Sequence, residues 1–261
     1  MTTSASGGVW ASRRFWWHLT QSELRARFRN SRLGALWCIV PPLALAVIVS
    51  AIMSTVFRTP AWKYFVFVLT GLVAWEFILG AVVLGASAIV NAEAYIRQRA
   101  LPLSIYPLKV VLANLFVLAL SSLACAAAAL AADGGTRLWP FLAALPVSLA
   151  LMFLFALPCA IIGALLQARF RDYAAMMAIA MQAVYFLSPV FITRQTFLDA
   201  GLAPLLQWNP LAALLACFRM PFEGIWPSAL DIGIAWAFVA LLWALAWVSL
   251  RRWGPRTVFY L

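Results

Sequence analysis

Glu76 is the only acidic side chain that lies deep within a long apolar stretch of this sequence, the run 64–90. A carboxylate in hydrocarbon costs several kcal/mol unless it is protonated, paired or in contact with water. Glu76 therefore either lines a polar pathway or hydrogen-bonds a neighbouring helix for structural reasons alone. Proton-driven carriers often use several ionisable groups inside the membrane, so a single carboxylate disfavours ion coupling.

Side chains that commonly perform enzymatic chemistry are few and poorly spaced. His18 is the single histidine and stands in a Trp-rich stretch, which favours an interfacial side chain over a catalyst. The four cysteines have neither metal-ligand nor disulfide spacing, which favours a packing role. They are Cys38, Cys125, Cys159 and Cys217. We predict no catalytic residue, no metal site and no bound cofactor in this chain.

Nucleotide-binding and hydrolase motifs are also missing from the sequence. It contains no G-x-x-x-x-G-K-[ST] loop, no HExxH or CxxC motif and no Gly-x-Ser-x-Gly. The chain cannot bind ATP in the P-loop manner. A pore-like domain of this kind needs a separate motor.

Composition predicts which solvent surrounds the fold. Hydrophobic residues make up 66% of the 261 residues and charged residues only 10%, whereas a soluble domain is near half apolar and a quarter charged. Lipid must therefore be the solvent for much of the surface, and helices satisfy their own backbone groups there. We expect one all-α membrane domain over residues 1–261.

Long apolar runs predict six transmembrane helices in that domain. They cover residues 33–57, 64–90, 105–132, 139–167, 174–192 and 228–250. Each run approaches or exceeds the roughly 20 residues that a helix needs to cross the hydrocarbon core.

Residues 9–30, before the first run, mix tryptophans with arginines. This pattern is typical of an amphipathic helix lying in the headgroup plane, and it is richer in aromatics than a disordered basic tail. The residues that we assign to this interfacial helix and to the basic start of the first span are Trp16, Trp17, Arg25, Arg27 and Arg29.

Segment 91–102 is a charged interruption before the third span. Its core is compatible with a helix, which Pro102 ends because the residue before a proline resists the helical region. A small helix across the membrane face and an ordinary loop are the two interpretations. Its polar candidates are Glu93, Tyr95, Arg97 and Arg99.

A compact charged turn, ARFRDY at 168–173, joins the fourth and fifth spans. We expect Arg169, Arg171 and Asp172 to form an ion-pair cluster at the membrane interface, although many such clusters are merely solvated.

The stretch 193–227 is too long for a simple turn. Its apolar pieces, 197–208 and 211–218, are too short to span, and Asn209 and Pro210 separate them. Short apolar pieces broken in this way predict a re-entrant helical pair, because irregular backbone at membrane depth must be buried in protein or line a cavity.

Basic residues indicate the orientation. Six spans put both termini on one side, and fourteen of the 19 Lys and Arg residues fall on that side. The other five are Arg58, Lys63, Arg137, Arg194 and Arg219. This bias places both termini in the cytoplasm and explains the net charge of +11 without nucleic acid.

Several segments together resemble the membrane permeases of type-2 ATP-binding-cassette exporters for polysaccharides, which carry O-antigen, capsule or teichoic acid. The similar segments are RARFRNSRLGALWCIVPP at 25–42, NAEAYIRQRALPLSIYPLKV at 91–110, ARFRDY at 168–173, FLSPVF at 186–191 and QWNPLAALLACFR at 207–219. They occur in order, and the resemblance covers nearly the whole chain.

The resemblance implies a homodimer in the bacterial inner membrane, bound to two ATPase subunits that hold ATP and Mg²⁺. Segment 91–102 would then be the coupling helix and 193–227 the gate on the outer side. A lipid-linked polysaccharide would be the cargo, with periplasmic or outer-membrane export proteins as further partners. Sugar rings stack on aromatic faces, so Tyr185 and Phe186 join Glu76, Asn209 and Pro210 as pathway or gate candidates.

Two other functions remain open at this point. The chain could be a type-2 permease for another cargo, such as a drug or a lipid. It could also be a membrane enzyme acting on lipid-linked substrates, although paired carboxylates and metal ligands are missing at membrane depth.

Overall fold

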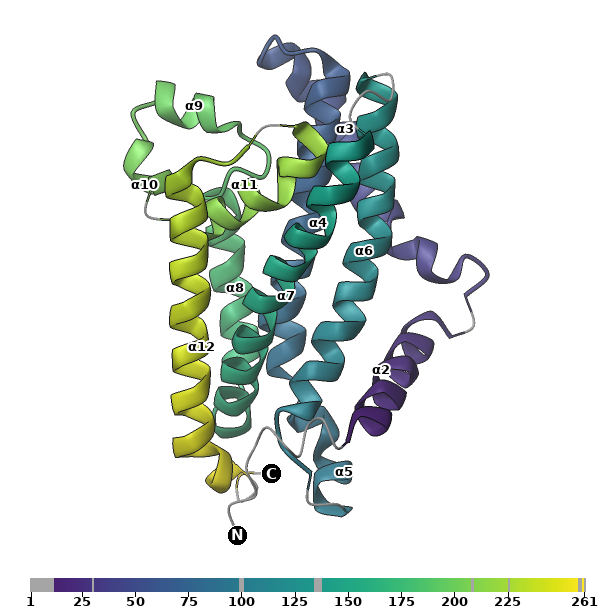
Figure 1. Cartoon of the computed structure of the whole chain (residues 1–261), viewed down its shortest axis with the longest axis vertical. Coiled ribbons are helices and arrows are strands. Elements are labelled where there is room, and N and C mark those ends of the chain that lie inside the picture. Colours follow the sequence, from purple (N-terminus) through teal and green to yellow (C-terminus); the bar gives the residue numbers. More distant parts are fainter. Residues whose placement is uncertain are drawn as a thin grey trace.

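The computed structural model describes residues 12–29, 31–98, 101–133, 138–207, 209–224, 226–257 and 260. Within these residues the regular structure is entirely helical. Long helices run side by side along the bundle, with shorter ones at its two ends (Figure 1). The predicted all-α membrane fold is confirmed.

In the part of the chain that the structure describes, five helices are long and apolar enough to cross a membrane. The first consists of a short 3-10 segment, η1 (Gly34–Cys38), followed by α3 (Val40–Val56), and the second is α4 (Ala61–Ala86). The others are α6 (Ile105–Asp133), α7 (Leu138–Arg169) and α12 (Ala229–Thr257). Their bounds lie within a few residues of five of the six predicted spans, except that α12 continues seven residues beyond the predicted end at 250.

The fifth predicted span, 174–192, is shorter in the structure. Its helix, α8 (Tyr173–Phe186), has 14 residues, which rise roughly 21 Å and fall short of a 30 Å hydrocarbon core. Pro189 explains the early end, because it has no backbone donor and restricts Ser188 before it. Residues 187–192 form turns instead of continuing the helix.

The remaining helices lie at the two ends of the bundle. The amphipathic α2 (Arg13–Phe28), η2 (Val90–Ala92) and α5 (Glu93–Gln98) lie toward the end where α12 finishes (Figure 1). The three helices α9 (Arg194–Asp199), α10 (Ala203–Gln207) and α11 (Pro210–Glu223) lie toward the opposite end. The part of 9–30 that precedes residue 12 lies outside the described residues.

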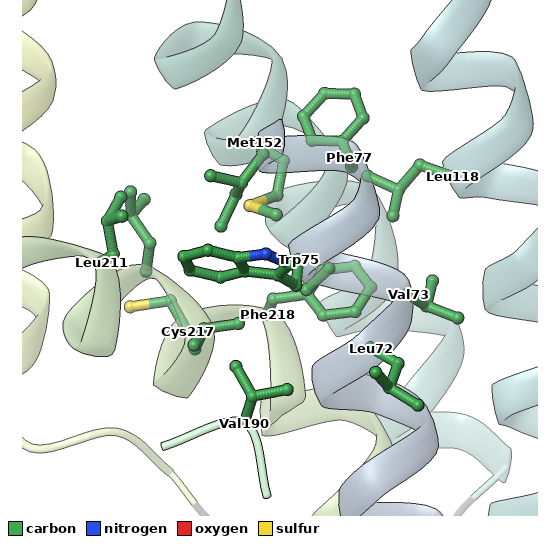
Figure 2. Packing of buried hydrophobic residues seen from close by; sticks show 14 of the residues in the cluster. Leu72, Val73, Trp75, Phe77, Leu118, Met152, Val190, Leu211, Cys217 and Phe218 are labelled. Atoms are coloured by element: carbon green, nitrogen blue, oxygen red, sulfur yellow. The ribbon is translucent and has the colours of Figure 1, made fainter. Parts of the chain in front are cut away.

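Helix α4 is at the centre of the packing and contacts α3, α6, α7, α8 and α11. Trp75 of α4 lies among Phe218 of α11, Met152 of α7 and other buried apolar side chains (Figure 2). Close approach to α7 depends on small residues, because a Cβ on Gly85 would lie 2.6 Å from the Cβ of Ala160. The core thus holds α11 rigidly against the long helices.

Candidate functional site

Asn209 begins α11 and also ties it to the end of α8. Its Oδ1 accepts a hydrogen bond from the Leu211 amide at 3.0 Å, which caps the helix. Its Nδ2 donates to the Ser188 hydroxyl at 2.9 Å and to the Leu187 carbonyl at 3.3 Å. Pro210 occupies the first turn of α11, where the missing amide costs no hydrogen bond.

Arg219 makes the most extensive buried polar contacts of α11. Its guanidinium donates to the carbonyls of Pro189 at 2.6 Å and Val190 at 3.1 Å, and to that of Phe67 at 3.1 Å. The same group lies 3.9 Å from the centre of the Phe67 ring, a cation–π contact. Only 5% of Arg219 is exposed. Arg219, which the sequence count places on the side opposite the termini, therefore lies in the protein interior.

The backbone around Arg219 is shaped to admit its guanidinium. A Cβ on Gly71 of α4 would collide with Nη2 of Arg219 and would lie 2.9 Å from the Val190 carbonyl. Glu223, one turn further along α11, places a carboxylate oxygen 3.6 Å from Nε of Arg219. Gly71 is thus required for the close approach of α4 to this arginine.

Two more hydrogen bonds attach the same region to the long helices. Tyr64 of α4 donates its hydroxyl to the Phe191 carbonyl at 2.6 Å, and Ser148 of α7 donates to the Cys217 carbonyl at 3.1 Å. Residues 188–191, α11 and one end of α4 therefore form a single hydrogen-bonded unit. We call this unit the Arg219 clamp.

Glu76 is exposed on the otherwise most buried helix of the fold, while its neighbours Trp75 and Phe77 point into the core. Its carboxylate acts electrostatically on Tyr185 of α8 and on Cys38 of η1. Glu76 therefore lies toward the side of the molecule on which η1 and α8 are found. We call the exposed residues of η1, α3 and α8 together with Glu76 the Glu76 face.

The two aromatic pathway candidates have different surroundings. Tyr185 packs against Trp75 with ring centres 5.1 Å apart and against Phe191 at 5.3 Å. Its ring therefore packs against the hydrophobic core. Phe186 touches Tyr185 edge-on at 5.4 Å and is 64% exposed. Of the two, Phe186 belongs to the Glu76 face.

The residues of the expected coupling helix project from the end of the bundle. Arg97 and Glu93 form an ion pair at 2.8 Å across one turn of α5, and Tyr95 is half exposed. Arg99 lies outside the described residues. The interpretation of 91–98 as helical is supported by η2 and α5.

Helix α2 is attached to the bundle by contacts that the sequence did not reveal. Glu23 pairs with Lys109 of α6 at 2.9 Å, and Arg27 donates to Oδ1 of Asn114 at 3.0 Å. Lys109 and Asn114 were not among the predicted site residues, because nothing in their own neighbourhood connects them to residues 23–27.

The other candidates of the basic start are more exposed. Trp16 packs edge-on against Trp17, with ring centres 6.3 Å apart, and Trp17 is half exposed. Arg25 and Arg29 are exposed.

The expected ion-pair cluster in the turn 168–173 is not formed among the described residues. Arg169 lies over the rings of Phe170 and Tyr260 at 5.6 and 5.8 Å, and Arg171 donates to the Tyr260 carbonyl at 3.3 Å. Asp172 precedes α8 without a side-chain capping bond. The arginines contact the chain's C-terminal end, which is remote in sequence, instead of the adjacent carboxylate.

No group of three or more His, Cys, Asp or Glu side chains that could hold a metal ion occurs in the part of the chain that the structure describes. The polar groups brought together are hydrogen-bond donors, backbone carbonyls and single carboxylates. This arrangement is suited to holding helices together.

Comparisons with known proteins agree with the resemblance. No family model matches the chain. It is 30% identical over 235 residues to the O-antigen export system permease protein RfbA of Myxococcus xanthus, covering 87% of each chain. It is also 23% identical over 202 residues to the protein of the same name from Klebsiella pneumoniae, covering 77% of each. This chain therefore belongs to the family of O-antigen export permeases, transport proteins of the polysaccharide-exporting type that its sequence resembles.

Proposed function

We propose that this chain is the membrane-spanning half of an ATP-driven exporter that moves a lipid-linked polysaccharide out of the cytoplasm across the inner membrane. The observation that carries the proposal is the 30% identity to an O-antigen export permease over 87% of both chains. ATP and Mg²⁺ would be bound by a separate ATPase subunit.

Glu76 supports a homodimer with the pathway at its centre. A charged side chain exposed to lipid costs roughly 3 kcal/mol or more at the middle of a membrane helix. The Glu76 face therefore needs protein or water beside it, and a second copy of this chain would supply both. Short helix α8 and exposed Phe186 lie on this side, where an incomplete span would border the path instead of lipid.

The proposed gate is the Arg219 clamp with α9 and α10, on the outer side. The proposed coupling helix is 91–102, at the opposite end of the bundle, where it would dock on the ATPase. Periplasmic or outer-membrane export proteins would receive the glycan beyond the gate. A lipid or drug as cargo is less well supported, because the curated relatives named above are O-antigen permeases.

Cysteine labelling tests the proposed orientation. In a background whose four native cysteines are replaced by alanine, we expect Asp199→Cys and Trp226→Cys to react only with reagent added from the periplasm. Both positions are exposed. Arg97→Cys should react only from the cytoplasm. Labelling of positions 199 and 226 from opposite sides would mean that α11 crosses the membrane, and the orientation would then be wrong.

A double substitution tests coupling to the ATPase. The ion pair of Glu93 and Arg97 is exposed, so removing it should cost the fold well under 1 kcal/mol. We expect Glu93→Ala with Arg97→Ala to lower cargo-stimulated ATP turnover of the copurified complex about fivefold or more, the usual range of a coupling free energy. Lys63→Ala, at the opposite end of α4, is the control. Wild-type turnover in the double variant would remove α5 from the coupling role.

A further inference from the structure

A cavity of about 300 Å³ lies between the end of α7 and the end of α12, away from the Glu76 face and from the Arg219 clamp. Its lining comes from two segments that are 80 residues or more apart in the sequence. The residues are Leu165, Leu166, Arg169, Phe170, Trp253, Arg256, Thr257 and Tyr260. Both charged groups in this lining are arginines.

Neither arginine is neutralised by a carboxylate in the described part of the chain. No Asp or Glu lines the cavity, and no ion pair joins Arg169 or Arg256 to a described residue. Arg169 is held instead by the rings of Phe170 and Tyr260, at 5.6 and 5.8 Å. Stacking on aromatic rings positions a guanidinium while leaving its donors available to an anion.

The turn that carries Arg169 is fixed before any ligand binds. Gln167 is buried, and its Oε1 accepts from the Ala174 amide at 2.6 Å while its Nε2 donates to the Arg171 carbonyl. Arg171 in turn donates to the Tyr260 carbonyl at 3.3 Å, which links the turn to the C-terminal end of the chain. The cavity is thus built from a hydrogen-bonded turn and not from freely moving loop side chains.

The floor of the cavity is apolar, since Leu165 is buried and Leu166 is partly buried, while Trp253 lines the cavity from a more exposed position. A ligand that matches this lining carries an anionic, oxygen-rich group next to a hydrocarbon chain. We propose that the cavity binds an acidic phospholipid, with its phosphodiester between Arg169 and Arg256 and the start of an acyl chain on the apolar wall. Guanidinium groups match phosphate oxygens in geometry and charge, and basic pockets between membrane helices at the cytoplasmic surface bind such headgroups.

The proposed orientation decides only which leaflet supplies this lipid. The lipid site does not depend on the identity of the exported cargo. A free carboxylate on an ATPase subunit could satisfy the arginines but would leave the apolar floor empty. The lipid satisfies both parts of the cavity, so charge and apolarity together favour it.

The test is native mass spectrometry of the full chain, released from nanodiscs that contain equal amounts of phosphatidylglycerol and phosphatidylcholine. Both leaflets are the same in such discs, so a wrong orientation would not affect the result. We expect wild type to retain phosphatidylglycerol preferentially. Replacing both arginines, Arg169→Gln with Arg256→Gln, should reduce that retention about thirtyfold, from roughly a fivefold effect of each charge near an acidic headgroup.

Arg252→Gln is the matched control, because Arg252 lies at the same end of α12 but outside the cavity lining. It should keep the preference of wild type. Higher ionic strength should weaken the retention of phosphatidylglycerol by wild type and by the control variant alike. Equal retention of the two lipids by wild type would overturn the proposal. An unchanged preference in the double variant, with loss of ATPase copurification, would assign the arginines to the ATPase instead and would also overturn it.

Discussion

Arg219→Leu is expected to destabilise the protein by about 4 kcal/mol and to abolish export. The substitution leaves the Pro189 and Val190 carbonyls buried without their donor, and each buried acceptor left in this way costs about 1–3 kcal/mol. It also removes the contact with the Phe67 ring and the cation beside Glu223. Because residues 188–191 follow α8 and are hydrogen-bonded to Asn209 and Arg219, the segment between α8 and α11 should lose its fixed position.

Thermal unfolding of the purified protein measures this effect, with an expected fall in Tm of roughly 10 °C. The Tm of Arg219→Lys should lie between those of wild type and Arg219→Leu. One ammonium group cannot reproduce the planar guanidinium, which reaches carbonyls from two segments. Lys63→Met, which alters an exposed cation near the same end of α4, should unfold like wild type. A Tm of Arg219→Leu equal to that of wild type would show that the clamp does not hold the outer segment.

Glu76→Leu is expected to reduce export about tenfold or more while leaving the protomer folded, and Glu76→Gln is expected to keep most of the activity. The side chain is exposed in the single chain, so its replacement removes no buried contact within that chain. A polar group facing the pathway loses one hydrogen bond of about 1.5 kcal/mol when leucine replaces it, which corresponds to about tenfold. Glutamine retains the hydrogen-bonding groups.

Surface polysaccharide, measured against the membrane level of each variant, reports the result. Reduced export by both variants, to the same extent, would mean that the charge itself is needed. Full export by Glu76→Leu would remove Glu76 from the pathway and from any interhelical network.

Much of the fold could be predicted because it depends on local properties of the sequence. Apolar length determines where helices can cross a bilayer, and Pro210 lies where α11 starts. The role of Asn209 at the break before α11 was predictable for the same reason, since a capping side chain acts on its own backbone. The length predicted for α8 was too great, because the apolar run continues through Ser188 and Pro189 without a change in hydropathy.

Long-range polar contacts could not be predicted from the same patterns. Arg219 directly follows the apolar piece 211–218 in the sequence, and its carbonyl partners are about 30 and 150 residues away. The one available signal was an arginine within the apolar run LLACFRMPF, which has to find buried partners. Contacts of Lys109 and Asn114 with α2, and the stacking of Arg169 on Tyr260, likewise depend on how distant segments pack.

Transport into inverted membrane vesicles tests the proposed function most directly. The vesicles would contain this chain, its ATPase partner and a lipid-linked polysaccharide on the outward-facing cytoplasmic leaflet. On addition of ATP and Mg²⁺, the polysaccharide should become protected from an added glycan-degrading enzyme, and a non-hydrolysable ATP analogue should give no protection. Vesicles without this chain should also give none. Polysaccharide that stays fully digestible while the complex hydrolyses ATP would contradict a role in polysaccharide export.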